Sequence, residues 1–141
     1  IHSAGKMNKL DERKLWTREF IGDQDGFLES MAAAAQAVHN YFERENGVIY
    51  ISVMNNMSVD CDCVDHPAPV KLNDYGILAS ADPVALDQAC VDIVNNLEVT
   101  AESDPTDLLK RIDKQHGTHT IDWAEKIGLG SKKYKIINID K

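Results

Sequence analysis

The fold of this chain is decided by one stretch, Val48-Ile49-Tyr50-Ile51-Ser52-Val53-Met54. It is a nearly unbroken run of apolar, mostly β-branched residues, which is typical of a strand covered on both faces in an α/β sheet. Further along the chain, Gly76-Ile77-Leu78-Ala79-Ser80 predicts a second buried strand. We therefore expect the two strands to be neighbours in one sheet, with helices packed on both of its faces.

Helical patterns lie on either side of these strands. Before the first strand, Asp25 is suited to cap a helix over residues 27–45. Apolar residues recur there at three- and four-residue steps, namely Phe27, Met31, Ala34, Val38, Tyr41 and Phe42. His39 lies away from this stripe, which predicts a surface histidine.

After the second strand, Asp82-Pro83 predicts a helix start, with a capping carboxylate followed by proline at the first helical position. Asp104-Pro105 repeats this pattern, Thr120 begins a short helix, and residues 134–139 predict a final strand. This order indicates an α/β fold with a mixed or parallel sheet of three or more strands and helices on its faces. We expect residues 1–141 to form a single α/β domain, the C-terminal fragment of a larger protein.

Composition excludes several classes of function. The formal net charge of −8 opposes binding to nucleic acid, because phosphate contacts need a basic surface. No apolar run approaches the ~20 residues of a membrane-spanning helix. Three cysteines, an odd number, argue against a secreted disulfide framework. We expect a cytoplasmic protein that binds neither nucleic acid nor membranes.

The strongest candidate for a functional site is the pair Cys61-Asp62-Cys63, just beyond the first strand. α/β folds commonly bind ligands beyond the carboxyl ends of strands. Soft thiolates select zinc, Cu(I) or iron–sulfur clusters over hard cations. A disulfide between such close neighbours is disfavoured by its geometry. The alternative is that Cys61 and Cys63 are free thiols in an ordinary loop, because a complete site usually takes four ligands.

Other residues are candidates for the remaining ligands. Cys90 is the third cysteine, although its place on the apolar face of a predicted helix also suits a core residue. The further candidates are His2, His66, His119, Asp60, Asp62 and Asp65. Asp82 and Asp87 have structural explanations, as a helix cap and a charge in the first helical turn.

Catalytic machinery is not evident in the sequence. It contains no P-loop, and Gly128-Leu129-Gly130 is too short for a dinucleotide fingerprint. A cysteine beside His66 can in principle act as a nucleophile with its base. Nothing else supports acyl transfer, so the sequence leaves enzymatic activity open.

Three stretches together resemble one family. Ser58-Val59-Asp60-Cys61-Asp62-Cys63, residues 76–90 and residues 127–134 look like the C-terminal half of the family called domain of unknown function 362. The opening, His2-Ser3-Ala4-Gly5-Lys6, is similar to a stretch near the middle of such proteins. Members are often described as iron–sulfur or ferredoxin-type proteins. The sequence contains neither of the two C-x-x-C-x-x-C runs found in the ferredoxin insert of some relatives. From the resemblance we also expect the N-terminal half of the family to be missing here.

The resemblance implies an iron–sulfur cluster, or alternatively zinc, held by Cys61, Cys63 and Cys90. It also implies electron transfer or another redox function, a redox partner protein, and association with the missing N-terminal half. A histidine is an alternative to Cys90 as third ligand, and a fourth ligand would come from that half, a partner chain or solvent. The main alternative is a metal-free structural or binding module of a larger protein. A thiol-dependent enzyme is the third hypothesis.

Overall fold

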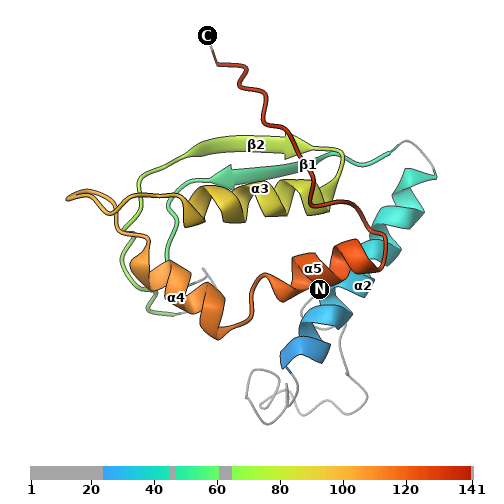
Figure 1. Ribbon diagram of the computed structural model, residues 1–141, viewed down its shortest axis with the longest axis horizontal. Helices are drawn as coiled ribbons and strands as arrows, with labels where there is room; N and C mark the ends of the chain where they lie inside the picture. Colours follow the sequence, from blue (N-terminus) through green and yellow to red (C-terminus); the bar gives the residue numbers. More distant parts are fainter. Residues whose placement is uncertain (1–23, 45–46, 61–64, 141) are drawn as a thin grey trace.

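A computed structural model describes residues 24–44, 47–60 and 65–140 of the chain. Figure 1 shows a small sheet underlain by one helix, with the remaining helices grouped on the far side of that helix. In chain order the elements are α2 (Gln24–Glu43), β1 (Tyr50–Met54), β2 (Gly76–Ser80), α3 (Pro83–Asn95), α4 (Thr106–Lys114) and α5 (His119–Lys126). The chain is thus a mixed α/β structure, as its sequence predicts.

The sheet consists of β1 and β2. They pair antiparallel, with Ile51 opposite Ala79 and Val53 opposite Ile77. The prediction that the two strands are neighbours is therefore confirmed. The described residues form only this two-stranded antiparallel sheet, so they do not support a mixed or parallel sheet of three or more strands. In particular, residues 134–139 do not form the expected final strand.

The described residues cover only one face of the sheet. Helix α3 packs against both strands, and Met54 is buried. On the opposite face, which we call the outer face, Ile51, Val53 and Ile77 are between 61% and 71% exposed. The expectation that helices bury both faces is wrong for the described residues. An apolar run shows that both faces of a strand are suited to burial, but it does not show which polypeptide covers them.

The main core lies where α2, α3 and α5 meet. Its buried members are Ala32, Val84, Ile121, Ala124 and Leu129. The buried stripe of α2 is rotated from the expected one, since Leu28 and Ala32 are its buried residues. Val38, Tyr41 and Phe42, which the sequence pattern placed on the packed face, are exposed. Small alanines let α5 approach α2 closely, whereas the larger aromatic residues lie towards the end of α2.

Helix α3 begins as the sequence predicts. The Asp82 Oδ1 atom accepts hydrogen bonds from the backbone N–H groups of Val84 at 2.8 Å and Ala85 at 3.0 Å. Pro83 occupies the first turn, where its missing N–H leaves no bond unmade. Asp87 lies beyond this first turn, so the expected first-turn charge is wrong. None of the helices in the described part of the chain is long and apolar enough to cross a membrane.

Candidate functional site

The candidate site lies on the connection between β1 and β2. Cys61, Asp62 and Cys63 fall in residues 61–64, outside the described residues, as does His2 near the start of the chain. The residues on both sides of the cysteine pair are described. They show how the ends of this segment are held.

Two side chains close the base of the segment. The Ser58 hydroxyl donates a hydrogen bond to the Ala68 carbonyl at 2.9 Å. The Asp60 Oδ2 atom accepts one from the Ala68 backbone N–H at 3.1 Å. The two bonds hold residue 68 beside residues 58 and 60, on either side of the cysteine pair. We call the contacts among Ser58, Asp60 and Ala68 the neck.

The neck is tied to α4. An Arg111 guanidinium nitrogen lies 3.1 Å from the Asp60 Oδ1 atom, so the Asp60 carboxylate holds Ala68 and Arg111 at once. Further along the connection, the Lys71 ammonium donates to the Asp107 carboxylate at 2.7 Å. This bond lowers the pKa of Asp107 and raises the pKa of Lys71, because it favours the charged form of each group. The residues on both sides of the cysteine pair are thereby fixed to α4, through Asp60 before it and Lys71 after it.

Backbone contacts extend this attachment. The Asp104 N–H donates to the Lys71 carbonyl at 2.7 Å, and the Asn73 N–H donates to the Ser103 hydroxyl at 3.2 Å. Ser103 is buried, and its hydroxyl is satisfied by this bond. Leu72 is buried beside a hollow of about 110 Å³ between the connection and α4. The described residues that follow the cysteine pair are therefore packed against α4 and the residues just before it.

The other predicted ligands are placed apart from the neck or are engaged elsewhere. His66 and Asp65 are almost fully exposed, and the His66 Nε2 atom lies 3.5 Å from the Asp65 Oδ2 atom. Cys90 is a free, partly buried thiol on α3. His119 Nε2 lies 3.1 Å from Glu29 Oε1 on α2, and its ring stacks on Trp123. Across the described part of the chain, no three His, Cys, Asp or Glu side chains form a group able to hold a metal ion.

His39 has a role that its place in the sequence pattern does not indicate. Its Nδ1 atom lies 2.8 Å from the Tyr50 hydroxyl, and the two rings stack. The histidine is partly buried between α2 and β1, so the prediction of a surface histidine is wrong. Burial is the main cause of a raised pKa for Tyr50. The rotated stripe of α2 explains the error, because the buried face passes through position 39 instead of position 38.

A larger hollow lies away from the cysteine loop. It has a volume of about 510 Å³ and lies between the ends of α3 and α4 and the start of α5. His116 and His119 line it, and each is bonded to a carboxylate of α2, Asp25 and Glu29 respectively. These two pairs join α2 to the connection between α4 and α5 and to the first residue of α5. Since both histidines already have carboxylate partners, we interpret them as structural.

Comparisons with known proteins identify a family but no individual relative. The family described as domain of unknown function (DUF362) matches residues 1–92, which include all three cysteines. A search of curated proteins found no match, and neither did a search of solved structures. The matched segment covers more than half of the sequence, from before α2 into α3. The chain therefore belongs to the DUF362 family.

Proposed function

We propose that this chain is the metal-binding part of an iron–sulfur redox protein, with Cys61 and Cys63 as ligands. The observation that carries the proposal is the neck, which holds together the two ends of the loop that contains both thiols. A metal site must offset the ordering of its loop and the loss of protons from its thiols. A loop whose ends are already joined loses less conformational freedom when its side chains converge on one ion.

The donor set suits a soft metal. Two thiolates are the ligands expected for an iron–sulfur cluster or zinc, and a hard cation would need an oxygen-rich site. Cys90 is the proposed third ligand, and a fourth would come from another polypeptide or solvent. An iron–sulfur cluster supplies one-electron transfer, whereas zinc would cross-link the loop. The protein's own part is to hold the loop through Asp60, Arg111 and Ala68.

Anaerobic reconstitution tests this proposal. The chain and its variants Cys61→Ser, Cys63→Ser and Cys90→Ser would be reconstituted with iron and sulfide, or separately with zinc. Bound metal would then be counted and the visible charge-transfer absorption recorded. We expect Cys61→Ser and Cys63→Ser each to lose most of the metal, and Cys90→Ser to lose it only if Cys90 is the third ligand. Equal metal content in the wild type and the Cys61 and Cys63 variants would overturn the proposal.

A second function is favoured by the outer face of the sheet. Three exposed β-branched side chains, Ile51, Val53 and Ile77, form an apolar surface beside a free strand edge. We propose that, in a longer protein, this face packs against the N-terminal half of the family, so that the chain is a C-terminal module. Such a module can pack against its partner while its thiols are reduced and bind no metal. Co-expression with that half, followed by isolation of a complex, tests the idea, and separate elution of the two pieces would contradict it.

The same proposal includes a redox partner protein and a cytoplasmic location. The odd number of cysteines supports the location, because paired cysteines are the rule in secreted disulfide frameworks. Enzymatic activity is left open.

A further inference from the structure

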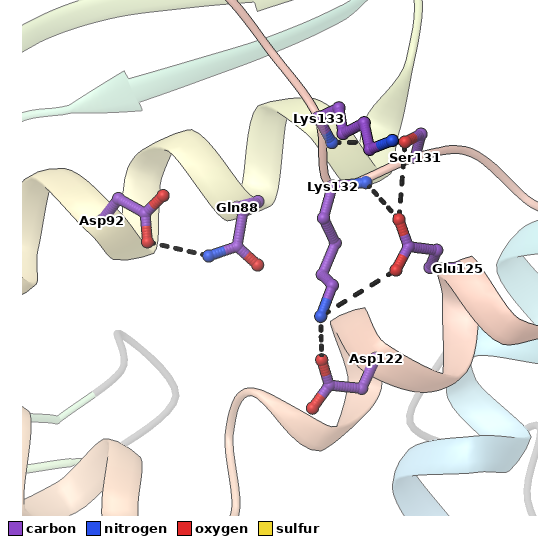
Figure 2. A network of polar contacts seen from close by, with 7 residues as sticks. All are labelled: Gln88, Asp92, Asp122, Glu125, Ser131, Lys132 and Lys133. Atoms are coloured by element: carbon purple, nitrogen blue, oxygen red, sulfur yellow. Dashed lines mark hydrogen bonds and ion pairs between the residues drawn. The ribbon is translucent and has the colours of Figure 1, made fainter.

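Residues 131–134 are firmly attached to the rest of the molecule. The Ser131 N–H donates to the Asp82 Oδ2 atom at 2.8 Å, just after the end of β2. The Lys132 N–H donates to Glu125 on α5 at 2.8 Å, and the Lys132 ammonium bonds Asp122 at 2.6 Å. Figure 2 shows the contacts of Lys132 with Glu125 and Asp122, which hold the segment against α5. The attachment fixes where the following residues start.

Tyr134 continues the attachment onto α3. Its hydroxyl donates a hydrogen bond to the Asp92 Oδ2 atom at 2.7 Å, and Asp92 also accepts one from Gln88. The tyrosine side chain therefore points towards the covered face of the sheet, where α3 lies. Residues 135–139 lack an attachment of this kind. Within the described residues, no backbone hydrogen bond joins residues 134–139 to another segment.

The attached segment runs beside the free edge of β2. A hollow of about 130 Å³ is lined by residues 78–80 of β2, by residues 134–137 and by α3. Consecutive residues of both segments line it, so the two backbones face each other across the gap. In Figure 1 the segment passes the sheet at the end of β2 and then departs from it. The unpaired N–H and C=O groups of a strand edge are a template for another strand.

We propose that residues 134–139 bind the free edge of β2 as a third, antiparallel strand. The direction follows from the Ser131–Asp82 bond, which starts the segment beside the end of β2 and leads it back past residues 80, 79 and 78. Closing the gap replaces solvent contacts of two backbones with a ladder of hydrogen bonds. This inference does not depend on metal binding.

The exposure of the side chains fits this arrangement. Tyr134 and Ile136 are alternate residues on the side of the segment that faces α3. Their exposed fractions are 40% and 53%. Ile137 and Ile139 are 75% and 87% exposed, the most open of the large apolar side chains in the segment. As a strand, the segment places residues 137 and 139 on the outer face beside β2, because alternate residues share a face. The apolar outer face would then extend over three strands, and a partner strand would have to use the free edge of β1.

Nuclear magnetic resonance of the isotopically labelled chain tests the pairing. Close Hα–Hα contacts between residues 134–139 and β2 are expected, because Cα atoms of paired antiparallel strands lie ~4.5–5.5 Å apart. The β2 amides that point away from β1 should exchange with solvent at least tenfold more slowly than in the variant Ile136→Pro/Ile137→Pro. Proline removes the N–H donors that such a strand needs.

The matched control is Ile136→Val/Ile137→Val, which keeps β-branched residues and both donors. It should leave the protection of the β2 amides unchanged. The amides that bond β2 to β1 report whether each variant is folded, and they should stay protected in all three proteins. The absence of contacts between the two segments in the wild type would overturn the proposal. So would equal exchange of the outward β2 amides in the wild type and the double-proline variant.

Discussion

Asp82 shows how far a single residue can be interpreted from sequence. The Asp-Pro pair predicts a helix cap, and the carboxylate does accept both expected bonds through one oxygen. Its other oxygen accepts the Ser131 N–H, a contact between residues 49 positions apart. A local motif holds no information on this second partner. The same carboxylate therefore joins the start of α3 to the segment that follows α5.

Gly130 is required by this double role. A Cβ atom added to Gly130 would overlap the Asp82 carboxylate, so substitution must displace one of them. We predict that Gly130→Ala lowers the free energy of unfolding by about 1–3 kcal/mol, measured by urea denaturation. A double-mutant cycle with Asp82→Ala tests whether overlap with the Asp82 carboxylate causes this loss of stability. In that background the alanine should cost much less, and a full, additive cost would show that the carboxylate is not the obstacle.

Asp87 gives a prediction on pH. Its carboxyl lies on α3 beside an apolar hollow of about 190 Å³, and desolvation raises its pKa above the ordinary value of 3.8. A raised carboxyl pKa means that the native state binds the proton more tightly than the unfolded state. The contribution of Asp87 to the free energy of unfolding is therefore fully present below the pKa that this carboxyl has in the unfolded state. It is lost as the pH rises through the pKa of the carboxyl in the folded state.

Asp87→Asn removes this loss. We predict that the variant is more stable than the wild type at about pH 7, and that the difference shrinks towards zero at about pH 3. Urea denaturation at both values measures it. Asp107→Asn is the control with the opposite sign, because the pKa of Asp107 is lowered by its bond with Lys71. A pH-independent difference for Asp87→Asn would contradict the assignment.

At the scale of elements, the sequence predicted the positions of the strands and helices better than it predicted what packs against them. Both strands and the helices beginning near Gln24, Pro83 and Thr106 occur where local patterns indicated. The face of α2 was misjudged because Val38, Tyr41 and Phe42 are apolar yet exposed, while Ala32 is buried. The buried face of α2 is selected by tertiary packing, chiefly against α5, which the helix's own sequence does not reveal. The neck was equally unpredictable, since it depends on Ala68 backbone groups and on Arg111 from α4.

The neck can be tested separately from the thiols. We predict that Asp60→Ala lowers the free energy of unfolding by about 1–2 kcal/mol, because it removes a hydrogen bond within the loop base and the Arg111 contact. It should also reduce the metal retained after reconstitution. Arg111→Gln, which removes the partly exposed ion pair alone, is the control and should cost less than about 1 kcal/mol. Metal retention that is the same in Asp60→Ala and the wild type would show that the neck does not organise the site.

At the scale of the whole molecule, the two faces of the sheet differ in what they contribute. Adjacent residues on β1 illustrate this, since Met54 is buried against the α3 side whereas Val53 is exposed on the outer face. The sequence predicted that both faces would be buried, because the two strands form nearly unbroken apolar runs. The exposure of the outer face is the larger departure from the expected burial of both faces. The outer face is also the surface that a partner polypeptide would cover.

Substitutions on the two faces should therefore behave differently. We predict that Ile51→Thr/Val53→Thr/Ile77→Thr changes the free energy of unfolding by less than about 0.5 kcal/mol per site, because these side chains already contact solvent. Threonine keeps a β-branched side chain, so strand propensity is preserved. Met54→Ala should cost about 2–5 kcal/mol, because it empties a buried position. The triple variant should also bind less of a hydrophobic dye such as ANS. A triple variant as unstable as Met54→Ala would mean that the outer face is already packed within this chain.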